Sequence, residues 1–151
     1  MPRGKKRSNV IESKMKIIIL HGKHNSGKTT TFNDLYEKLL ANGAIITNPK
    51  KELPAKDDFE CIINYKGKKV ALFSLGDYMF AIGSAVGYYT KVECDILAIA
   101  HSMKTPIHKN ALFKQRKYDY AIINKEFDGV YMKDEDAVEK IIAEIENYTL
   151  K

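Results

Sequence analysis

Residues 15–30 of the chain read MKIIILHGKHNSGKTT, and this stretch decides which fold we expect. It opens with a stretch of strand length, Met15–Leu20, in which Ile17–Leu20 are all apolar, and continues directly into a turn that carries two glycines. After the turn, apolar residues recur at helical spacing over Thr29–Ala41, and Asn42-Gly43 ends that helix. The stretch therefore predicts a strand, a glycine-rich turn and an amphipathic helix, in that order.

The turn itself, from Gly22 to Thr29, fits the pattern G-x-x-x-x-G-K-[ST] without a gap. Its glycines let backbone N–H groups and the start of the helix come close to a bound phosphate. The Lys28 ammonium is placed to reach β- and γ-phosphates, and the Thr29 hydroxyl to complete the ligand sphere of Mg²⁺. We therefore expect a nucleoside triphosphate to be bound by Gly22, Lys23, His24, Asn25, Ser26, Gly27, Lys28, Thr29 and Thr30.

This turn resembles the Walker A element of the P-loop NTPase superfamily. Its Asn-Ser-Gly-Lys-Thr-Thr form is most similar to small nucleoside and nucleotide kinases and to some nucleotide-binding accessory proteins. The resemblance implies ATP and Mg²⁺ as cofactors, with Thr29 as a metal ligand and Lys28 in a catalytic role. It implies either a Mg²⁺-dependent phosphotransferase acting on a nucleoside, nucleotide or other small metabolite, or an ATP hydrolase.

The same resemblance implies a second carboxylate on the metal side, after another apolar strand. Asp77 is the first acid after the run Val70–Leu75, so we expect it to be a metal ligand and catalytic residue, or alternatively the N-cap of the next helix. A basic lid over the phosphates is also implied. Residues 101–118 hold five basic groups and no acid, and Arg116 is the candidate lid arginine; the alternative is a solvated helical face.

Strands and helices alternate along the rest of the chain. This order predicts an α/β fold, a three-layer α/β/α sandwich with a mostly parallel sheet and one antiparallel hairpin strand at its edge. The expected strands cover 44–47, 59–65, 68–75, 96–100 and 120–123, the expected helices cover 78–90 and 134–148, and 48–58 is expected to be a loop. Within the helix at 78–90 we expect Gly83 and Gly87 to pack against the sheet.

Several polar residues follow the expected strands, and ligands of open parallel sheets bind at the carboxyl ends of the strands. That rule places Gly22, Asp77, His101, Ser102, Asn124 and Lys125 at one edge. There His101 would contact phosphate or act as a base, or would only be a polar residue at a strand end. A phosphoryl acceptor would lie over the 43–58 loop and the region from Asp77 to Tyr89.

Composition limits the partners and the compartment. The 151 residues suit one domain, for which we expect residues 15–151, preceded by a mobile basic tail at 1–14. The net charge of +6 comes from that tail and from residues 101–118, so we expect a triphosphate as the anion, with nucleic acid engaged only through the tail. No apolar run is long enough to span a membrane, and Cys61 and Cys94 suit reduced thiols in the cytoplasm.

Two other functions remain open at this point. The hairpin before Ser74-Leu75-Gly76 resembles the switch region of small GTPases, although Phe73 stands where their Asp would be. The segment Asn124-Lys125-Glu126-Phe127 also lacks the acid of their guanine-reading motif, so ATP is favoured over GTP. The other alternative is a non-catalytic module that binds a partner in response to nucleotide.

Overall fold

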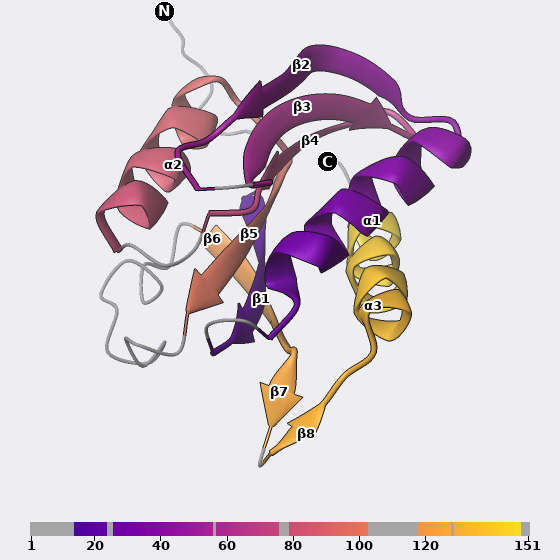
Figure 1. Ribbon diagram of the computed structural model, residues 1–151. Helices are drawn as coiled ribbons and strands as arrows, with labels where there is room; N and C mark the ends of the chain where they lie inside the picture. The colour runs from indigo at the N-terminus through magenta and orange to yellow at the C-terminus, as the bar shows by residue number, and fades with distance from the viewer. Residues whose placement is uncertain are drawn as a thin grey trace, which may run out of the picture.

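The computed structural model describes residues 14–23, 26–55, 57–75, 79–102, 118–127 and 129–148. Within these ranges the chain is an α/β protein with a mixed sheet of six strands, three helices and a separate two-stranded hairpin (Figure 1). In chain order the elements are β1 Met15–Gly22, α1 Lys28–Ala41, β2 Ile45–Glu52, β3 Phe59–Tyr65, β4 Lys68–Phe73, α2 Met79–Lys91, β5 Ile96–Ser102, β6 Tyr118–Asn124, β7 Glu126–Phe127, β8 Val130–Tyr131 and α3 Asp134–Asn147.

The strand that precedes the glycine-rich turn lies inside the sheet, whose order is β2-β3-β4-β5-β1-β6. β1 pairs in parallel with both β5 and β6, and β4 pairs in parallel with β5. β3 runs antiparallel to both of its neighbours, β2 and β4. The register sets His21 of β1 beside His101 of β5 and Asn124 of β6, so these strands end together at one edge of the sheet.

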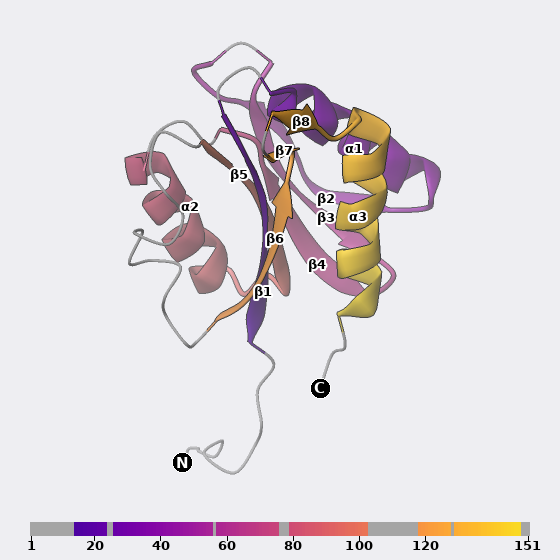
Figure 2. The same cartoon turned by 90° about the horizontal axis from the view of Figure 1, so that it is seen from below.

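Both faces of the sheet are covered by helices. α1 and α3 lie on one face, and α2 lies on the other (Figures 1 and 2). Alternate residues of β1 divide between two cores: Ile18 and Leu20 pack with α1 and α3, whereas Ile17 and Ile19 pack with α2. All seven residues of β5 are buried, which explains the continuous apolar run Ile96–Ala100 at its start.

The second strand extends further than the sequence suggested. We expected a strand at 44–47 and a loop from 48 onward, but β2 continues to Glu52 through Pro49. Two register shifts against β3 mark the irregular part, and every residue of β2 is exposed. An edge strand tolerates proline because its outward N–H needs no ladder partner, so the prolines that predicted a loop did not prevent strand formation.

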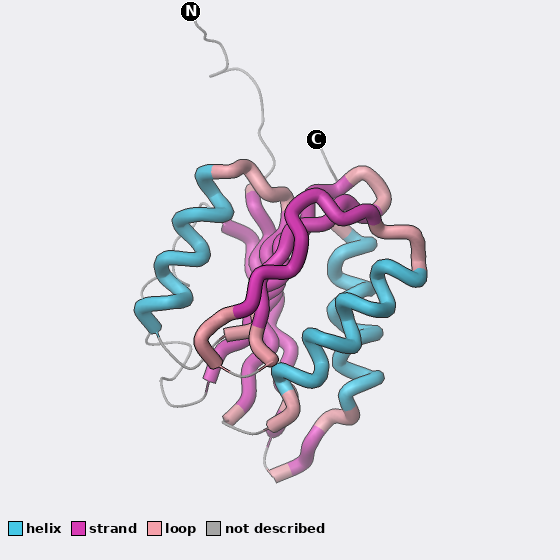
Figure 3. Tube along the Cα trace, turned by 45° about the horizontal axis from the view of Figure 1, so that its top comes forward, coloured by secondary structure: helices cyan, strands magenta, loops and turns pink. Residues whose placement is uncertain are grey.

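The helices α1, α2 and α3 fall close to their predicted ranges (Figure 3). The expected packing of Gly83 and Gly87 against the sheet is wrong, because a Cβ atom at either position would meet nothing within 4 Å. The sheet is contacted instead through Ala85, Val86 and Tyr89. No helix among the described residues is long and apolar enough to cross a membrane.

Candidate functional site

The glycine-rich turn lies between β1 and α1, at the edge of the sheet where β1, β5 and β6 end. Of the residues that we predicted to bind phosphate, Gly22, Lys23 and the run Ser26–Thr30 are described. His24 and Asn25 lie outside the described residues. The same is true of Asp77 and Arg116, so their predicted roles stay predictions.

The Lys28 side chain is directed back into the turn. Its ammonium donates to the backbone carbonyl oxygens of Gly22 and Lys23, both at 2.8 Å, and lies 3.5 Å from Ser26 Oγ. The residue is only 7% exposed although it carries a full charge. Such a charge is stable there because loop oxygens surround it, and anionic phosphate oxygens would serve the same ammonium better.

Neighbouring side chains approach both glycines of the turn closely. A Cβ atom on Gly22 would lie 2.6 Å from Ser26 Oγ, and one on Gly27 would lie 2.9 Å from Asp134 Oδ1. Gly27 also has a φ of +92°, which an L-amino acid with a side chain adopts only at a cost. Side chains therefore pack closely against the backbone of the turn, and among the described residues no side chain caps the first turn of α1.

A buried carboxylate that we did not predict contacts the turn from the neighbouring hairpin. Asp58 Oδ1 accepts hydrogen bonds from the hydroxyl of Thr29 at 2.8 Å and from the hydroxyl of Ser74 at 2.7 Å. Asp58 is 6% exposed and Ser74 is 2% exposed. Ser74 directly follows β4, and its hydroxyl also accepts a hydrogen bond from the Phe59 N–H at 2.9 Å.

The direction of β3 explains why Asp58 reaches this place. β3 is antiparallel to β4, and Glu60 near its start pairs with Phe73 at the end of β4. An acid that precedes β3 therefore lies at the same edge as the carboxyl ends of the parallel strands. The prediction considered acids that follow strands, whereas Asp58 precedes one; the hairpin expected around Lys66-Gly67 was the signal that could have revealed it.

Two histidines meet beneath the turn. His21 Nδ1 and His101 Nδ1 lie 2.9 Å apart, and the rings are stacked with centroids 5.0 Å apart. Burial, then the neighbouring His21 and Lys28 charges, lowers the pKa of His101 to about 4. Burial and Lys28 also lower the pKa of His21 from its ordinary value. Both imidazoles are therefore neutral at pH 7, and one ring donates the shared hydrogen while the other accepts it.

A second buried lysine joins the turn to α3. The Lys125 ammonium lies 2.9 Å from Asp134 Oδ1 and also donates to the backbone carbonyl of Met132. Thr31 Oγ1 donates to Asp134 Oδ1 at 3.2 Å and to the Gly27 carbonyl at 2.8 Å. Lys125 was predicted to lie at this edge, and its partners show that it braces the end of the turn against α3.

The edge of the sheet therefore collects an ammonium, two hydroxyls, a carboxylate and an imidazole pair around one turn. Hydroxyl and carboxylate oxygens such as those of Thr29, Asp58 and Ser74 are the donors that Mg²⁺ prefers, so these residues fit that ion. Among the described residues, no group of three or more histidine, cysteine or acidic side chains could hold a metal by itself. The chain matches no family model, no curated protein and no solved structure at a significant level.

Proposed function

We propose that this chain is an ATP-binding P-loop protein, a three-layer α/β/α sandwich with a mostly parallel sheet, that acts as a Mg²⁺-dependent phosphotransferase in the cytoplasm. The observation that carries the proposal is the pairing at the turn. The Lys28 ammonium donates hydrogen bonds to loop carbonyls, and the adjacent Thr29 hydroxyl donates one to the buried carboxylate of Asp58. The two buried free cysteines, Cys61 and Cys94, suit a reducing compartment.

In this proposal the turn and the start of α1 hold the phosphates through backbone N–H groups. The Lys28 ammonium leaves the Gly22 and Lys23 carbonyls and binds oxygens of the β- and γ-phosphates. Thr29 and Asp58 would hold Mg²⁺, which supplies charge neutralisation on the phosphates. Asp77 and Arg116 keep their predicted roles as a metal-side carboxylate and a lid arginine.

The reaction transfers one phosphoryl group to a small acceptor. The acceptor's hydroxyl oxygen forms a bond to the γ-phosphorus, and the bond from that phosphorus to the β–γ bridging oxygen breaks. ADP leaves with the electron pair, and the hydroxyl proton passes to solvent. The protein contributes position and electrostatic stabilisation, because phosphoryl transfer requires little covalent chemistry from side chains.

The test compares Lys28→Ala with Lys38→Ala, a matched control on the same helix whose side chain is about half exposed. ATP and GTP binding are measured with and without Mg²⁺, together with phosphate release and transfer. We expect Lys28→Ala to weaken ATP binding about 100-fold, as expected for losing a charge-assisted contact in a dry site, and Lys38→Ala to leave it unchanged.

Circular dichroism of both variants checks that they fold. Equal ATP affinity in a folded Lys28→Ala variant would contradict the proposal. Tighter binding of GTP than of ATP would replace it with the GTPase-like alternative. ATP turnover that produces free phosphate and no transfer to any nucleoside, nucleotide or metabolite tested would identify a hydrolase in place of a phosphotransferase.

A further inference from the structure

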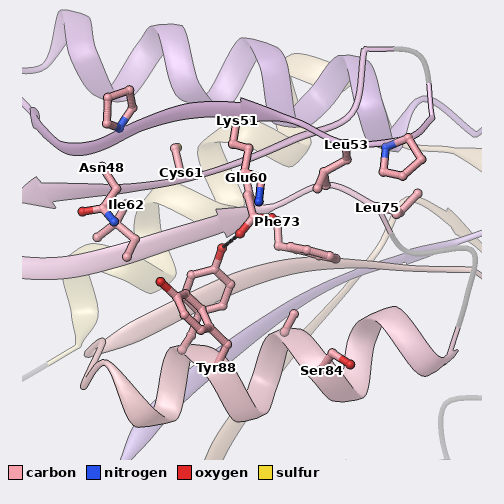
Figure 4. Close-up of a pocket in the computed structure, with 14 residues that line it drawn as sticks. Asn48, Lys51, Leu53, Glu60, Cys61, Ile62, Phe73, Leu75, Ser84 and Tyr88 are labelled. Atoms are coloured by element: carbon pink, nitrogen blue, oxygen red, sulfur yellow. Dashed lines mark hydrogen bonds between the residues drawn. The ribbon is translucent and has the colours of Figure 1, made fainter.

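A cavity of about 680 Å³ lies between α2 and the sheet, on the side of the β2–β4 strands away from α1. Figure 4 shows its lining residues, contributed by β2, β3, β4, the turn after β2 and one face of α2. Its volume falls within the range of pockets that hold small organic molecules, about 300–1,000 Å³. None of the residues predicted from the glycine-rich turn lines it.

The walls of the cavity are mostly apolar and partly aromatic. Phe73 and Ile62 lie on the sheet side, and Leu53 and Leu75 line the end toward the turn after β2. Tyr88 contributes a ring from α2 that is 49% exposed, set edge to face against Tyr89. Broad apolar and aromatic walls suit a planar ring, since aromatic groups gain from stacked and edge-on contacts.

One carboxylate faces these apolar walls. Glu60 Oε1 accepts a hydrogen bond of 2.6 Å from the Tyr89 hydroxyl. Burial, followed by this bond to Glu60, raises the pKa of Tyr89, so the phenol keeps its proton and remains the donor. A carboxylate accepts at two oxygens, and Tyr89 uses one of them, so Glu60 retains acceptor capacity for N–H groups of a ligand.

The cavity extends to the phosphate side of the molecule. Leu53, which lines it, donates its backbone N–H to the carbonyl of Asp58 at 3.0 Å, and Asp58 holds Thr29. Phe73 and Leu75 line the cavity on either side of Ser74, the second partner of Asp58. The Leu53 and Leu75 end of the cavity is therefore joined through the backbone to Asp58 and Ser74, although the side chains of Asp58 and Ser74 do not line it.

We infer that this cavity binds the ring of an uncharged nitrogen heterocycle, the base of a nucleoside, between the Tyr88 and Phe73 walls with an N–H donated to Glu60. The inference rests on the proposed function for one point only, that this ligand is the phosphoryl acceptor. A nucleotide is disfavoured, because the Glu60 carboxylate repels its phosphate and, among the described residues that line the cavity, only Lys51 is basic.

The test measures binding of adenosine, guanosine, cytidine, uridine and thymidine to the full chain by calorimetry, with free ribose and the five monophosphates as comparisons. At least one nucleoside binds, ribose does not, and the matching monophosphate binds about tenfold more weakly. Glu60→Gln weakens the nucleoside about tenfold, because the charged acceptor is lost. The matched variant Glu52→Gln, on the exposed edge strand β2, leaves binding unchanged.

Tyr89→Phe separates recognition from folding, because it removes the hydroxyl and keeps the Glu60 carboxylate. It retains nucleoside affinity within about threefold. The inference is overturned if no nucleoside binds, if ribose or a monophosphate binds as well as the nucleoside, or if Tyr89→Phe loses as much affinity as Glu60→Gln.

Lys28→Ala and ATP competition distinguish this inference from the proposed function. The nucleoside binds Lys28→Ala normally and binds the wild type together with ATP. Displacement of the nucleoside by equimolar ATP would show one shared site and overturn the inference. ATP binding without nucleoside binding would support the proposed function and overturn the inference. Glu60-dependent nucleoside binding without ATP binding would support the inference and contradict the proposed function.

Discussion

The turn before α1 and the helix α2 each carry two glycines four or five residues apart, and the surroundings of the two pairs differ. A Cβ atom on Gly22 or Gly27 would meet a neighbouring oxygen at 2.6 or 2.9 Å. A Cβ atom on Gly83 or Gly87 would meet nothing within 4 Å. Neighbouring side chains therefore crowd both glycines of the turn, whereas both glycines of α2 have open space beside them.

The two regions also differ in how they could admit a ligand. The turn is already filled by its own lysine and hydroxyl groups, so a phosphate binds there only by exchanging hydrogen bonds with them. The other face of the sheet has a cavity of about 680 Å³ beside α2, where a ligand displaces water and gains apolar contact. Substitutions in the two regions are expected to have opposite consequences for stability.

The largest effect is expected for Gly27→Ala. The new methyl group would press on Asp134 and weaken its ion pair with Lys125, and the backbone would be strained at a φ of +92°. We expect the free energy of unfolding to fall by about 3 kcal/mol, from strain and a disturbed buried ion pair together. Urea denaturation measures this change.

Gly67→Ala is the matched control, because Gly67 also has a positive φ, of +80°, and a Cβ atom there would have open space. It should cost about 1 kcal/mol, from backbone strain alone. An equal fall in the free energy of unfolding for Gly27→Ala and Gly67→Ala would show that the turn is not packed as tightly as its contacts indicate.

A smaller effect is expected from the histidine pair as the pH falls. The folded-state pKa of His101 is about 4, below its ordinary value of 6.5, so the unfolded chain takes up the proton first. The stabilisation is complete above pH 6.5 and is lost as the pH falls toward 4. We expect the wild type to lose about 2 kcal/mol across this window, measured by denaturation at each pH.

His101→Asn keeps a side chain that can hydrogen-bond to His21 and removes the titrating group. The free energy of unfolding of the variant should therefore change less steeply with pH between pH 6.5 and 4 than that of the wild type. Part of the slope remains, because the pKa of His21 is lowered as well. An unchanged slope would mean that carboxylates elsewhere account for the acid sensitivity.

Some of this architecture could be predicted because its signals are local in sequence. The glycine-rich turn occupies eight consecutive residues, and the apolar spacing of α1 and α3 is read within a few turns of helix. β2 was shortened in the prediction because the prolines that follow Asn48 usually indicate a loop, and only its position at the edge of the sheet permits Pro49 in a strand.

The partners of the turn could not be read in the same way, because they depend on pairing between distant strands. His21 meets His101 through the parallel register of β1 and β5, and Asp58 reaches Thr29 because β3 runs antiparallel to β4. A phosphoryl acceptor was expected over the 43–58 loop and the region from Asp77 to Tyr89, and part of the cavity lining lies in these two ranges. The wall from β3 and β4 was not expected, because it depends on pairing between distant strands.

The smallest effect, and the one of opposite sign, is expected for Gly87→Ala. Gly87 is exposed in the interior of α2, where a methyl group meets no neighbour and the backbone of alanine is more restricted in the unfolded chain. We expect the free energy of unfolding to rise by about 0.5–1 kcal/mol. Gly83→Ala should give a similar gain, and the double variant should give the sum of the two, because neither new methyl group has a contact to share. Loss of stability in either variant would show that neighbouring atoms pack against this face of α2. Both glycine pairs would then be closely packed, and the contrast between the turn and α2 would be wrong.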